Sequence, residues 1–429
     1  MIGSGAREHA LVRGLAADPA VDAVIAAPGN AGIDTLALCR PVQADAPAAV
    51  ADLAAELGVD LVVVGPEAPL VAGVADAVRA RGIRCFGPSK AGARLEGSKA
   101  FAKEVMAAAG VPTALARVCS TVEEVSAALA AFGAPHVVKD DGLAAGKGVV
   151  VTDDPAAALA HAAACLERPG ARVVVEEFLD GPEVSLFCIT DGRTVVPLAP
   201  AQDFKRVGEG DTGPNTGGMG AYSPLPWAPP DLVGEVVARV AQPTVDEMVR
   251  RGTPFAGVLY VGLALTSRGM RVVEFNARFG DPEIQVVLAR LVTPLAGLLL
   301  AAATGELDSL PPLRWQDTTA VTVVVAAENY PGTPRSGDVI DGLDQAGEVP
   351  DAWVLHAGTR RDAEGRVTSA GGRVLSVVAT GADLDAARKT VYAAVDRIRL
   401  DGAHHRRDIA ERAAAGTITV PAPLAAPGS

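Results

Sequence analysis

A glycine-rich turn between two β-branched runs places the strongest constraint on how this chain folds. The chain runs through Val137–Val138 into the turn DDGLAAGKG at 140–148 and leaves through Val149–Val151, a pattern typical of two strands of one hairpin. Three glycines in the turn let backbone N–H groups approach an anion, and Lys139 and Lys147 add positive charge on either side. The pattern predicts a hairpin flap over the phosphates of a nucleotide.

This turn does not match a P-loop. The P-loop motif GxxxxGK[ST] needs a longer gap between its glycines than the three residues that separate Gly142 from Gly146, and it needs a hydroxyl residue where Gly148 stands. The chain also returns directly to a strand, so no helix N-terminus cradles the phosphate. Taken alone, the hairpin fits an ordinary glycine-rich turn with two exposed lysines equally well.

A later strand carries the second chemical signal. In the segment VVEFNARFGDPE at 272–283, Glu274 and Asn276 are two residues apart, so their side chains leave the same face of a strand. A carboxylate and an amide oxygen on one face suit a Mg²⁺ ion that also binds water and phosphate oxygens. A simple surface pair is the alternative, and it is disfavoured because three more charged residues follow within the segment.

The first part of the chain alternates short apolar runs with alanine-rich stretches, which predicts βαβ units and a parallel sheet. We expect strands at 23–27, 61–64 and 83–86 and helices near 9–17, 46–57 and 70–81. A dinucleotide fingerprint at Gly3-Ser4-Gly5 is disfavoured because its third glycine position holds Glu8, although the helix that follows can still hold one phosphate. Only two residues precede Gly3, so we expect the native chain to begin a few codons earlier.

Composition limits the classes of function. The chain has 429 residues, enough for about three domains. Its net charge of −13 argues against nucleic-acid binding, because a phosphate backbone would be repelled over most of the surface. No apolar run approaches the ~18 residues of a membrane span, and no leader opens the chain, so we expect a cytoplasmic protein. The five cysteines are odd in number and widely spaced, which indicates free thiols.

The second half holds one unusual segment. Gln202–Pro226 is so rich in glycine and proline that we expect no regular element in it. Disorder is one interpretation, but its aromatic and charged residues favour an ordered loop that lines a site. From about 315 onward we expect strands at 319–327, 352–357 and 373–379, a helix near 383–397 and a loose tail after 420.

Several motifs together resemble the glycinamide ribonucleotide synthetase family of the ATP-grasp superfamily. They are GSGAREHA at 3–10, APGNAG at 27–32, GPEAPL at 65–70, LEGSKAF at 95–101, DGLAAGKGV at 141–149, the acids at 176–181, DTGPNTGGMGAYSP at 211–224 and the segment 274–283. The resemblance runs nearly end to end. It implies an α/β and α+β multidomain ATP-grasp fold with these parts: a Rossmann-like pre-ATP-grasp domain at 1–97, a central lobe at 98–118 and 190–314, a mobile lid at 119–189, a C-terminal domain at 315–420 and a tail at 421–429.

The resemblance also implies roles for individual residues. The ATP phosphates would meet Lys99, Lys139, Gly146, Lys147 and Gly148; the nucleoside would meet Glu176, Glu177, Leu179 and Glu183; and Mg²⁺, with Mn²⁺ able to substitute, would be held by Glu274 and Asn276. Arg278, Lys147 and Asp211 would be catalytic. The substrates would lie among Gly5, Arg7, Glu67, Asp211, Asn215, Gly217, Gly218, Arg278 and Asp281.

The reaction implied is the ATP-dependent ligation of glycine to 5-phosphoribosylamine, through glycyl phosphate, in purine synthesis. We expect a monomer without a further synthase domain. Two alternatives remain open: another ATP-grasp enzyme, such as a purine-pathway carboxylase or formate-using transferase, which should lack the 211–224 motif, and a nucleotide-binding regulator that has lost catalysis. One departure is Asp140, where the family usually has alanine; strand alternation from Lys139 predicts that its side chain points away from the phosphates.

Overall fold

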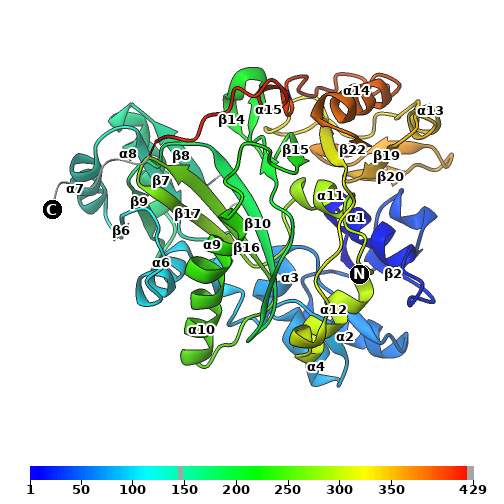
Figure 1. Cartoon of the computed structure of the whole chain (residues 1–429), viewed down its shortest axis with the longest axis horizontal. Coiled ribbons are helices and arrows are strands. Elements are labelled where there is room, and N and C mark those ends of the chain that lie inside the picture. The colour runs from blue at the N-terminus through cyan, green and yellow to red at the C-terminus, as the bar shows by residue number, and fades with distance from the viewer. Residues whose placement is uncertain (144–147, 423–429) are drawn as a thin grey trace.

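The computed structural model describes residues 1–143 and 148–422 and divides them among several sheets (Figure 1). In the first part β1 (Ile2–Gly3), β2 (Ile25–Pro28) and β3 (Leu38–Cys39) pair in parallel, as do β4 (Leu61–Val63) and β5 (Arg84–Phe86). Helices α1 (Ala6–Ala16), α2 (Pro47–Glu56), α3 (Glu67–Ala72) and α4 (Val74–Ala80) follow the strands. The predicted parallel arrangement is confirmed. The single helix expected at 70–81 is instead two, because Gly73 adopts a left-handed φ of 101° between them.

A connection that contains α5 (Arg94–Gly97) and α6 (Lys99–Ala108) leads to a small four-stranded unit. Ser98 is the N-cap of α6. The unit is an antiparallel sheet of order β6 (Ala116–Cys119), β9 (Val173–Glu176), β7 (His136–Asp140) and β8 (Val149–Thr152), and it packs against α7 (Val122–Phe132) and α8 (Pro155–Leu166). The β7–β8 pair is the predicted hairpin, with Lys139 opposite Val149.

The central sheet lies next to this unit in Figure 1. Its order is β11 (Val195–Pro197), β10 (Glu183–Asp191), β16 (Ala256–Thr266) and β17 (Gly269–Asn276), all antiparallel. The helices of this part are α9 (Leu232–Val236), which continues through a π-turn at Val237–Ala241 into α10 (Gln242–Arg250), and then α11 (Glu283–Leu288) and α12 (Leu295–Thr304). The π-turn keeps the helix continuous from Leu232 to Arg250.

The third sheet shows that one prediction was wrong. Segment 202–226, expected to be irregular, supplies β12 (Gln202–Asp203) and β15 (Gly220–Ser223) to a sheet of order β12, β15, β18 (Thr319–Ala326), β22 (Arg373–Gly381) and β19 (Ala352–His356). A Cβ at Gly220 would lie 2.7 Å from both Ile409 and the Thr322 carbonyl oxygen. Glycine there permits close strand packing, which composition alone cannot distinguish from a turn.

The remaining elements form two-stranded sheets and helices. They are β13 (Arg206–Gly208) and β14 (Thr212–Asn215), β20 (Thr359–Arg361) and β21 (Val367–Ser369), and the helices α13 (Leu343–Gly347), α14 (Leu384–Val395) and α15 (Glu411–Ala414).

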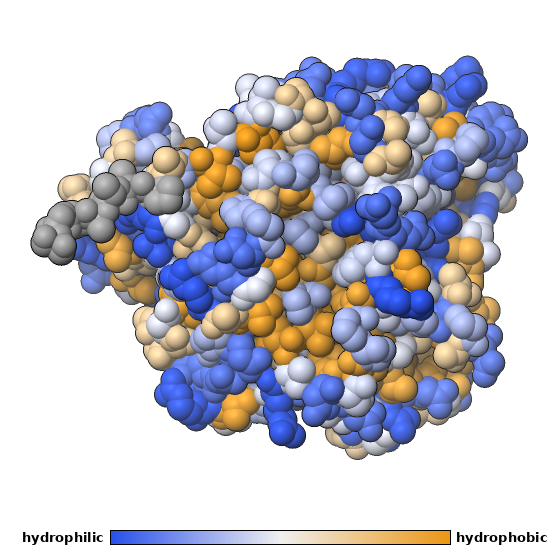
Figure 2. Space-filling view, viewed as in Figure 1, coloured by the Kyte–Doolittle hydropathy of each residue, from blue (hydrophilic) through white to orange (hydrophobic). Residues whose placement is uncertain are grey.

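None of the helices in the described ranges has the length and apolarity needed to cross a membrane. All five cysteines fall in those ranges and are free. Figure 2 shows hydrophilic residues over much of the visible face and hydrophobic residues gathered near its centre.

Candidate active site

A cavity of about 830 Å³ opens between the four-stranded unit and the central sheet. It gathers residues from β7, β9, β17, α6 and the C-terminal part, which are far apart in sequence. The sequence-predicted residues that line it are Arg7, Glu67, Lys99, Lys139, Gly148, Glu176, Glu177, Leu179, Glu183, Asp211, Asn215, Gly217, Glu274, Asn276, Arg278 and Asp281. Gly5 and Gly218 stand just outside the lining, and Gly146 and Lys147 fall outside the described residues.

Two lysines on one wall share a buried acid. Lys139 Nζ lies 2.9 Å from Glu176 Oε2, and Lys103 Nζ lies 3.1 Å from Glu176 Oε1. Lys139 also donates a 3.0 Å hydrogen bond to the carbonyl oxygen of Val273 on β17, and so bridges the two sheets. Burial lowers the pKa of Lys103, although Glu176 opposes this. Because the lysines contact both oxygens, the Glu176 carboxylate orients the two lysines.

The segment after β9 forms the end of the cavity. Its first residue, Glu177, exchanges bonds with Leu115: the Glu177 amide donates to the Leu115 carbonyl at 3.0 Å, and the Glu177 carboxylate accepts from the Leu115 amide at 2.9 Å. The next residues, Phe178 and Leu179, line the cavity, and among the described residues the Leu179 amide has no hydrogen-bond acceptor. Apolar walls beside a free amide suit a flat base with an acceptor nitrogen. The other apolar lining residues include Met106, Val137, Val151 and Ala264.

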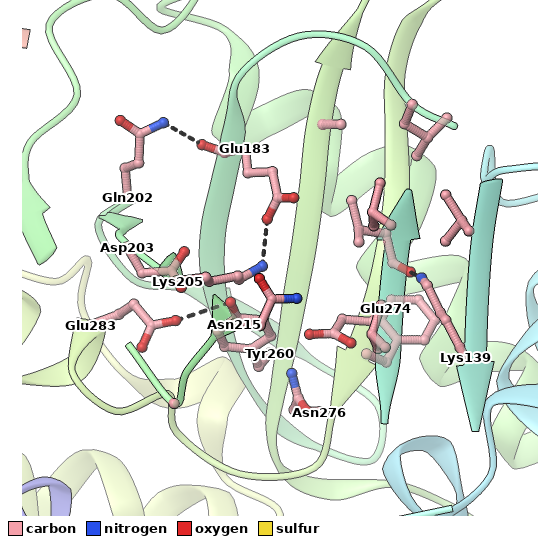
Figure 3. Close-up of a pocket in the computed structure, with 18 of the residues that line it drawn as sticks. Lys139, Glu183, Gln202, Asp203, Lys205, Asn215, Tyr260, Glu274, Asn276 and Glu283 are labelled. Carbon is pink, nitrogen blue, oxygen red and sulfur yellow. Dashed lines mark hydrogen bonds and ion pairs between the residues drawn. The ribbon is translucent and has the colours of Figure 1, made fainter. Parts of the chain in front are cut away.

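The predicted metal ligands face the cavity from β17 (Figure 3). Within the described parts of the chain, the Glu274 carboxylate and the Asn276 amide make no hydrogen bond or ion pair. Burial would raise the pKa of Glu274, but Lys205, Lys139 and other cations outweigh it and hold the pKa below its usual value. An ionised carboxylate and an amide oxygen without partners fit a hard divalent cation. The described residues contain no group of three acids, histidines or cysteines placed to hold a metal, so phosphate and water oxygens would complete the coordination.

A polar cluster opposite Glu274 joins the predicted residue Glu183 to side chains that were given no role from the sequence. Lys205 pairs with Glu183, and Tyr260 donates a 3.0 Å hydrogen bond to Glu283 (Figure 3). Burial raises the pKa of Asp203 to about 7, with Lys205 opposing and Glu283 adding to the rise. Asp203 and Lys205 are two residues apart, a spacing that places side chains on one face only if the segment is extended. That signal was hidden because 202–226 was interpreted as an irregular loop.

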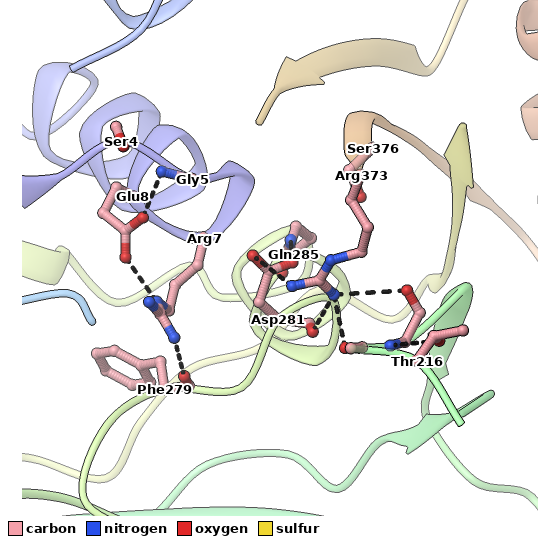
Figure 4. A network of polar contacts seen from close by, with 12 residues as sticks. Ser4, Gly5, Arg7, Glu8, Thr216, Phe279, Asp281, Gln285, Arg373 and Ser376 are labelled. Atoms are coloured by element: carbon pink, nitrogen blue, oxygen red, sulfur yellow. Dashed lines mark hydrogen bonds and ion pairs between the residues drawn. The ribbon is translucent and has the colours of Figure 1, made fainter. Parts of the chain in front are cut away.

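The opposite end of the cavity is built from the first and last parts of the chain (Figure 4). Arg7 Nε lies 2.6 Å from Glu8 Oε1, and Arg7 Nη1 donates to the Phe279 carbonyl at 3.1 Å. Glu8 also accepts a 2.6 Å hydrogen bond from the Gly5 amide. The helix start that was expected to hold a phosphate therefore already holds a buried carboxylate, and the Gly5 amide is occupied.

Arg373 on β22 joins this end to the 211–224 segment, and it is a residue that sequence reasoning did not find. Its Nη1 donates to the carbonyl oxygens of Gly217 and Asp281, each at 2.6 Å, and its Nη2 lies 3.4 Å from the Asp281 carboxylate. Arg7 and Arg373 pull the pKa of Asp281 below its usual value, although burial would raise it. One arginine of the C-terminal part thus fixes both the predicted substrate loop and a predicted substrate ligand.

Two of the predicted catalytic residues, Arg278 and Asp211, are held by ion pairs. Arg278 lies between acids, with Nε 3.3 Å from Glu67 and Nη2 3.1 Å from Glu96. Burial would lower the pKa of Arg278, but Glu96 and Glu67 raise it, so its charge is secure. Asp211 lies 2.8 Å from Arg406, a buried residue of the C-terminal part. Both contacts orient the side chains that sequence reasoning proposed as catalytic.

Asp140 points away from the cavity, as strand alternation predicted. Its carboxylate pairs with Arg168, which follows α8. Asp140 is absent from the cavity lining, whereas its neighbour Lys139 is part of it. The extra charge therefore lies on the far side of β7 from the predicted phosphate position.

Replacing Asp140 with alanine should leave the Kd for ATP within about twofold of its original value, because the charge is screened by Arg168 and faces away. The expected cost in the free energy of unfolding is about 1 kcal/mol, since the pair is partly exposed. Isothermal titration with ATP and a urea unfolding curve measure the two quantities. A large gain in ATP affinity would contradict the outward orientation.

Comparisons with known proteins agree with this geometry. The chain matches the family models described as phosphoribosylglycinamide synthetase N domain at residues 1–96, ATP-grasp (A) domain at 97–284 and C domain at 320–412. A phosphoribosylamine–glycine ligase of Streptomyces coelicolor is 70% identical over 416 residues, which cover 96% of this chain and 99% of that protein. The chain belongs to the phosphoribosylglycinamide synthetase family.

Solved structures show the same architecture. A crystal structure of phosphoribosylamine–glycine ligase from Thermotoga maritima has a TM-score of 0.81 and 31% identity, with 95% of this chain and 98% of that chain covered. The biotin carboxylase domain of the Hydrogenobacter thermophilus 2-oxoglutarate carboxylase, solved with MgADP, has a TM-score of 0.71 at 17% identity, covering 94% and 90%. The predicted family, the ATP-grasp fold and the ligase class are confirmed. Phosphoribosylglycinamide synthetases of this fold use ATP with a divalent metal.

Proposed function

We propose that this chain joins glycine to 5-phosphoribosylamine and converts ATP to ADP and phosphate, with glycyl phosphate formed in the 830 Å³ cavity. The observation that supports this most directly is that Lys139 and Glu274, from different sheets, face the same cavity. A polyphosphate between them would meet a fixed cation on one side, and on the other a carboxylate that would hold the divalent cation bound to the phosphates. The substrates are small anions or amines, which suits a cavity lined by charges of both signs.

The reaction order follows from the chemistry of the groups. A carboxylate is a poor electrophile, so the γ-phosphoryl of ATP is transferred to the glycine carboxylate first, and the amine of phosphoribosylamine then displaces phosphate. The protein contributes position and charge neutralisation and forms no covalent bond. Mg²⁺, with Mn²⁺ able to replace it, would be held by Glu274 and Asn276 and would neutralise the transferred phosphoryl group. Lys99 and Lys139 would neutralise its other oxygens.

The nucleoside and the second substrate occupy opposite ends of this arrangement. The base would lie in the apolar slot beside Leu179, and Glu183 would face the ribose hydroxyls. The phosphoribosyl group would lie near Arg7, Glu67, Asn215, Gly217 and Asp281. Arg278, oriented by its two acids, would face the acyl phosphate, since its planar fork matches a planar or tetrahedral anion.

We also propose that the four-stranded unit within the predicted lid range 119–189 acts as a lid over the central lobe; the last part of that range, from Glu183, belongs to β10 of the central sheet. It has its own sheet and its own hydrophobic core around Val125, Val138 and Val175. Its described contacts with the central sheet include the hydrogen bond from Lys139 to Val273 and the 3.0 Å ion pair between Glu177 and Arg268, which a rotating lid can break and remake. Both walls of the cavity come from one chain, so the proposal is that a monomer is active.

The test is ADP release with ATP, glycine and freshly made phosphoribosylamine, each omitted once. Turnover should require all three. ADP release that continues without glycine, or that requires bicarbonate or formate instead, would replace the proposal with another ATP-grasp reaction. ATP binding without any turnover would indicate a nucleotide-binding regulator.

The pH dependence of kcat should show the protonation of the Asp203 carboxylate. We propose that its ionised carboxylate accepts the proton that the attacking amine releases. Because burial raises its pKa to about 7, the carboxylate is protonated below that pH and ionised above it. We expect kcat to fall about tenfold per pH unit below this pKa and to level off above it. The Asp203→Asn variant should lose this acidic limb, measured as ADP release across the range; an unchanged limb in the variant would assign it to another group.

A further inference from the structure

The strap, residues 417–422, is the last described segment of the chain, and it lies at the active-site cavity. It follows α15, and Figure 1 shows it as the red segment that runs from α15 towards the four-stranded unit. Two residues of the strap, Ile418 and Thr419, line the cavity. The cavity is therefore covered in part by the end of the described chain.

The strap is fixed near both of its ends. At its start, Gly416 follows α15 with a left-handed φ of 66°, and the amide and hydroxyl of Thr417 donate to the Arg412 carbonyl oxygen at 2.9 and 3.1 Å. At its far end, Pro421 packs on Gly181, because a Cβ at Gly181 would lie 3.2 Å from Pro421 Cδ. Gly181 lies in the turn that leads from β9 of the four-stranded unit to β10 of the central sheet. The strap thus joins the C-terminal part to the connection between these two sheets.

The contact between Pro421 and Gly181 places Ile418 at the nucleoside end of the cavity. Ile418 precedes Pro421 by three residues, and Phe178 precedes Gly181 by three. Three residues span at most about 11 Å, so the Cα atoms of Ile418 and Phe178 each lie within that distance of their partner in the contact. Leu179, beside which the proposed function places the base, lies between Phe178 and Gly181 and lines the same cavity. Ile418 therefore belongs to the same end of the cavity as the apolar slot.

Apolar surface at this end of the cavity lacks a cover from the protein. Phe178 lines the cavity and yet keeps 45% of its surface exposed. Ile418 packs against the main hydrophobic core but is only half-buried. Two apolar side chains left open at one end of a cavity are typical of a ligand site, because a flat apolar ligand removes both of them from water.

The strap is held by side-chain packing and not by a backbone ladder. Among the described residues, the amides of Ile418, Thr419, Val420 and Ala422 have no hydrogen-bond acceptor. Amides of this kind open to solvent at little cost in free energy. A ligand that packs against the strap would therefore hold it more firmly in place, and exchange of these amides would become slower.

We propose that the strap is part of the nucleotide site and that Ile418 packs against the base of ATP. Ile418, Phe178 and Leu179 together enclose the base, while Lys99 and Lys139 serve the phosphates. Ile418 adds affinity for the base and none for the phosphates, since its side chain has neither a charge nor a hydrogen-bond donor. This inference rests on the proposed function for the position of the base. It goes beyond that function by making the C-terminal part of the chain a contributor to nucleotide binding.

Calorimetric titration of the full chain with two probes tests this role. The probes are ADP and tripolyphosphate, each with Mg²⁺, and only ADP carries a base. Ile418→Ala should raise the Kd for ADP about tenfold, because apolar contact with the base is lost, and should leave the Kd for tripolyphosphate within about twofold of its original value. Val420→Ala is the matched control and should bind both probes normally, because Val420 is an exposed residue of the same strap and does not line the cavity.

Hydrogen exchange followed by mass spectrometry gives a second measurement, which needs no variant. In the parent chain, ADP should slow exchange of the strap amides at least severalfold. Tripolyphosphate should leave their exchange unchanged, because it fills the phosphate position without reaching the base slot.

An unchanged Kd for ADP in Ile418→Ala would overturn the proposal. Equal losses of affinity for ADP and tripolyphosphate would also overturn it, since they would show that Ile418 supports the fold and does not contact the base. Strap amides that exchange at the same rate with and without ADP would do the same. If ADP bound through the strap but the chain showed no glycine-dependent turnover, the proposed function would fail while the role of the strap still stood.

Discussion

Replacing Glu274 with glutamine should lower kcat for ADP release by about 10³-fold at saturating substrates. The change keeps the shape of the side chain and removes its charge. Glu274 is the acid in the cavity whose pKa is held down by Lys205, Lys139 and other cations, so it is ionised when a metal and a polyphosphate bind. Without that charge the divalent cation loses its protein carboxylate and the phosphoryl group loses a counter-charge at the point of transfer.

The measurement is ADP release as a function of Mg²⁺ concentration. The variant should also need much more Mg²⁺ to reach half its maximal rate, which a purely structural defect would not produce. Glu235→Gln is the matched control, because Glu235 forms an exposed pair with Arg239 within its own helical segment. A Glu274→Gln enzyme with nearly normal kcat and normal Mg²⁺ dependence would remove Glu274 from the metal site.

Replacing Arg373 with methionine should raise the KM for phosphoribosylamine by about 10²-fold. Methionine keeps most of the side-chain length but loses the bonds to the Gly217 and Asp281 carbonyls and the ion pair with the Asp281 carboxylate. The 211–224 segment and Asp281 would then separate, and the position of the second substrate would be lost. The KM for ATP should change little, since the ATP phosphates are expected at the other end of the cavity.

Initial-rate kinetics with each substrate varied in turn separate the two KM values. Arg360→Met is the matched control, because Arg360 is an exposed arginine on β20, in the same part of the chain. Equal increases in both KM values, or a loss of cooperative unfolding in urea, would show that Arg373 supports the fold as a whole and does not specifically position one substrate.

Several parts of the site could be predicted from the sequence because they depend on the spacing of residues that are close together in the chain. β-branched residues on both sides of a glycine-rich turn predicted the β7–β8 hairpin, and two-residue spacing predicted that Glu274 and Asn276 share a face. Alternation from Lys139 predicted that Asp140 points outward. Each of these inferences depends on residues only a few positions apart.

The error about segment 202–226 has a long-range cause. Gly220 belongs to a strand, not a turn, because β15 pairs with β18, about a hundred residues later in the chain. β15 pairs in turn with β12, which extends the segment that carries Asp203 and Lys205. The error about Glu8 is local: its carboxylate accepts from the Gly5 amide three residues earlier, a capping contact that the motif comparison did not consider.

The sequence by itself determined the family, the order of most elements and the types of chemical group that the site uses, because these depend on motifs and local spacing. Only the tertiary structure decided which charge neutralises which. It assigned Glu176 to Lys139 and Lys103, Glu67 and Glu96 to Arg278, and Arg373 to Asp281. Coulomb energies depend on distance and burial, and neither is fixed until segments far apart in the chain are packed against one another.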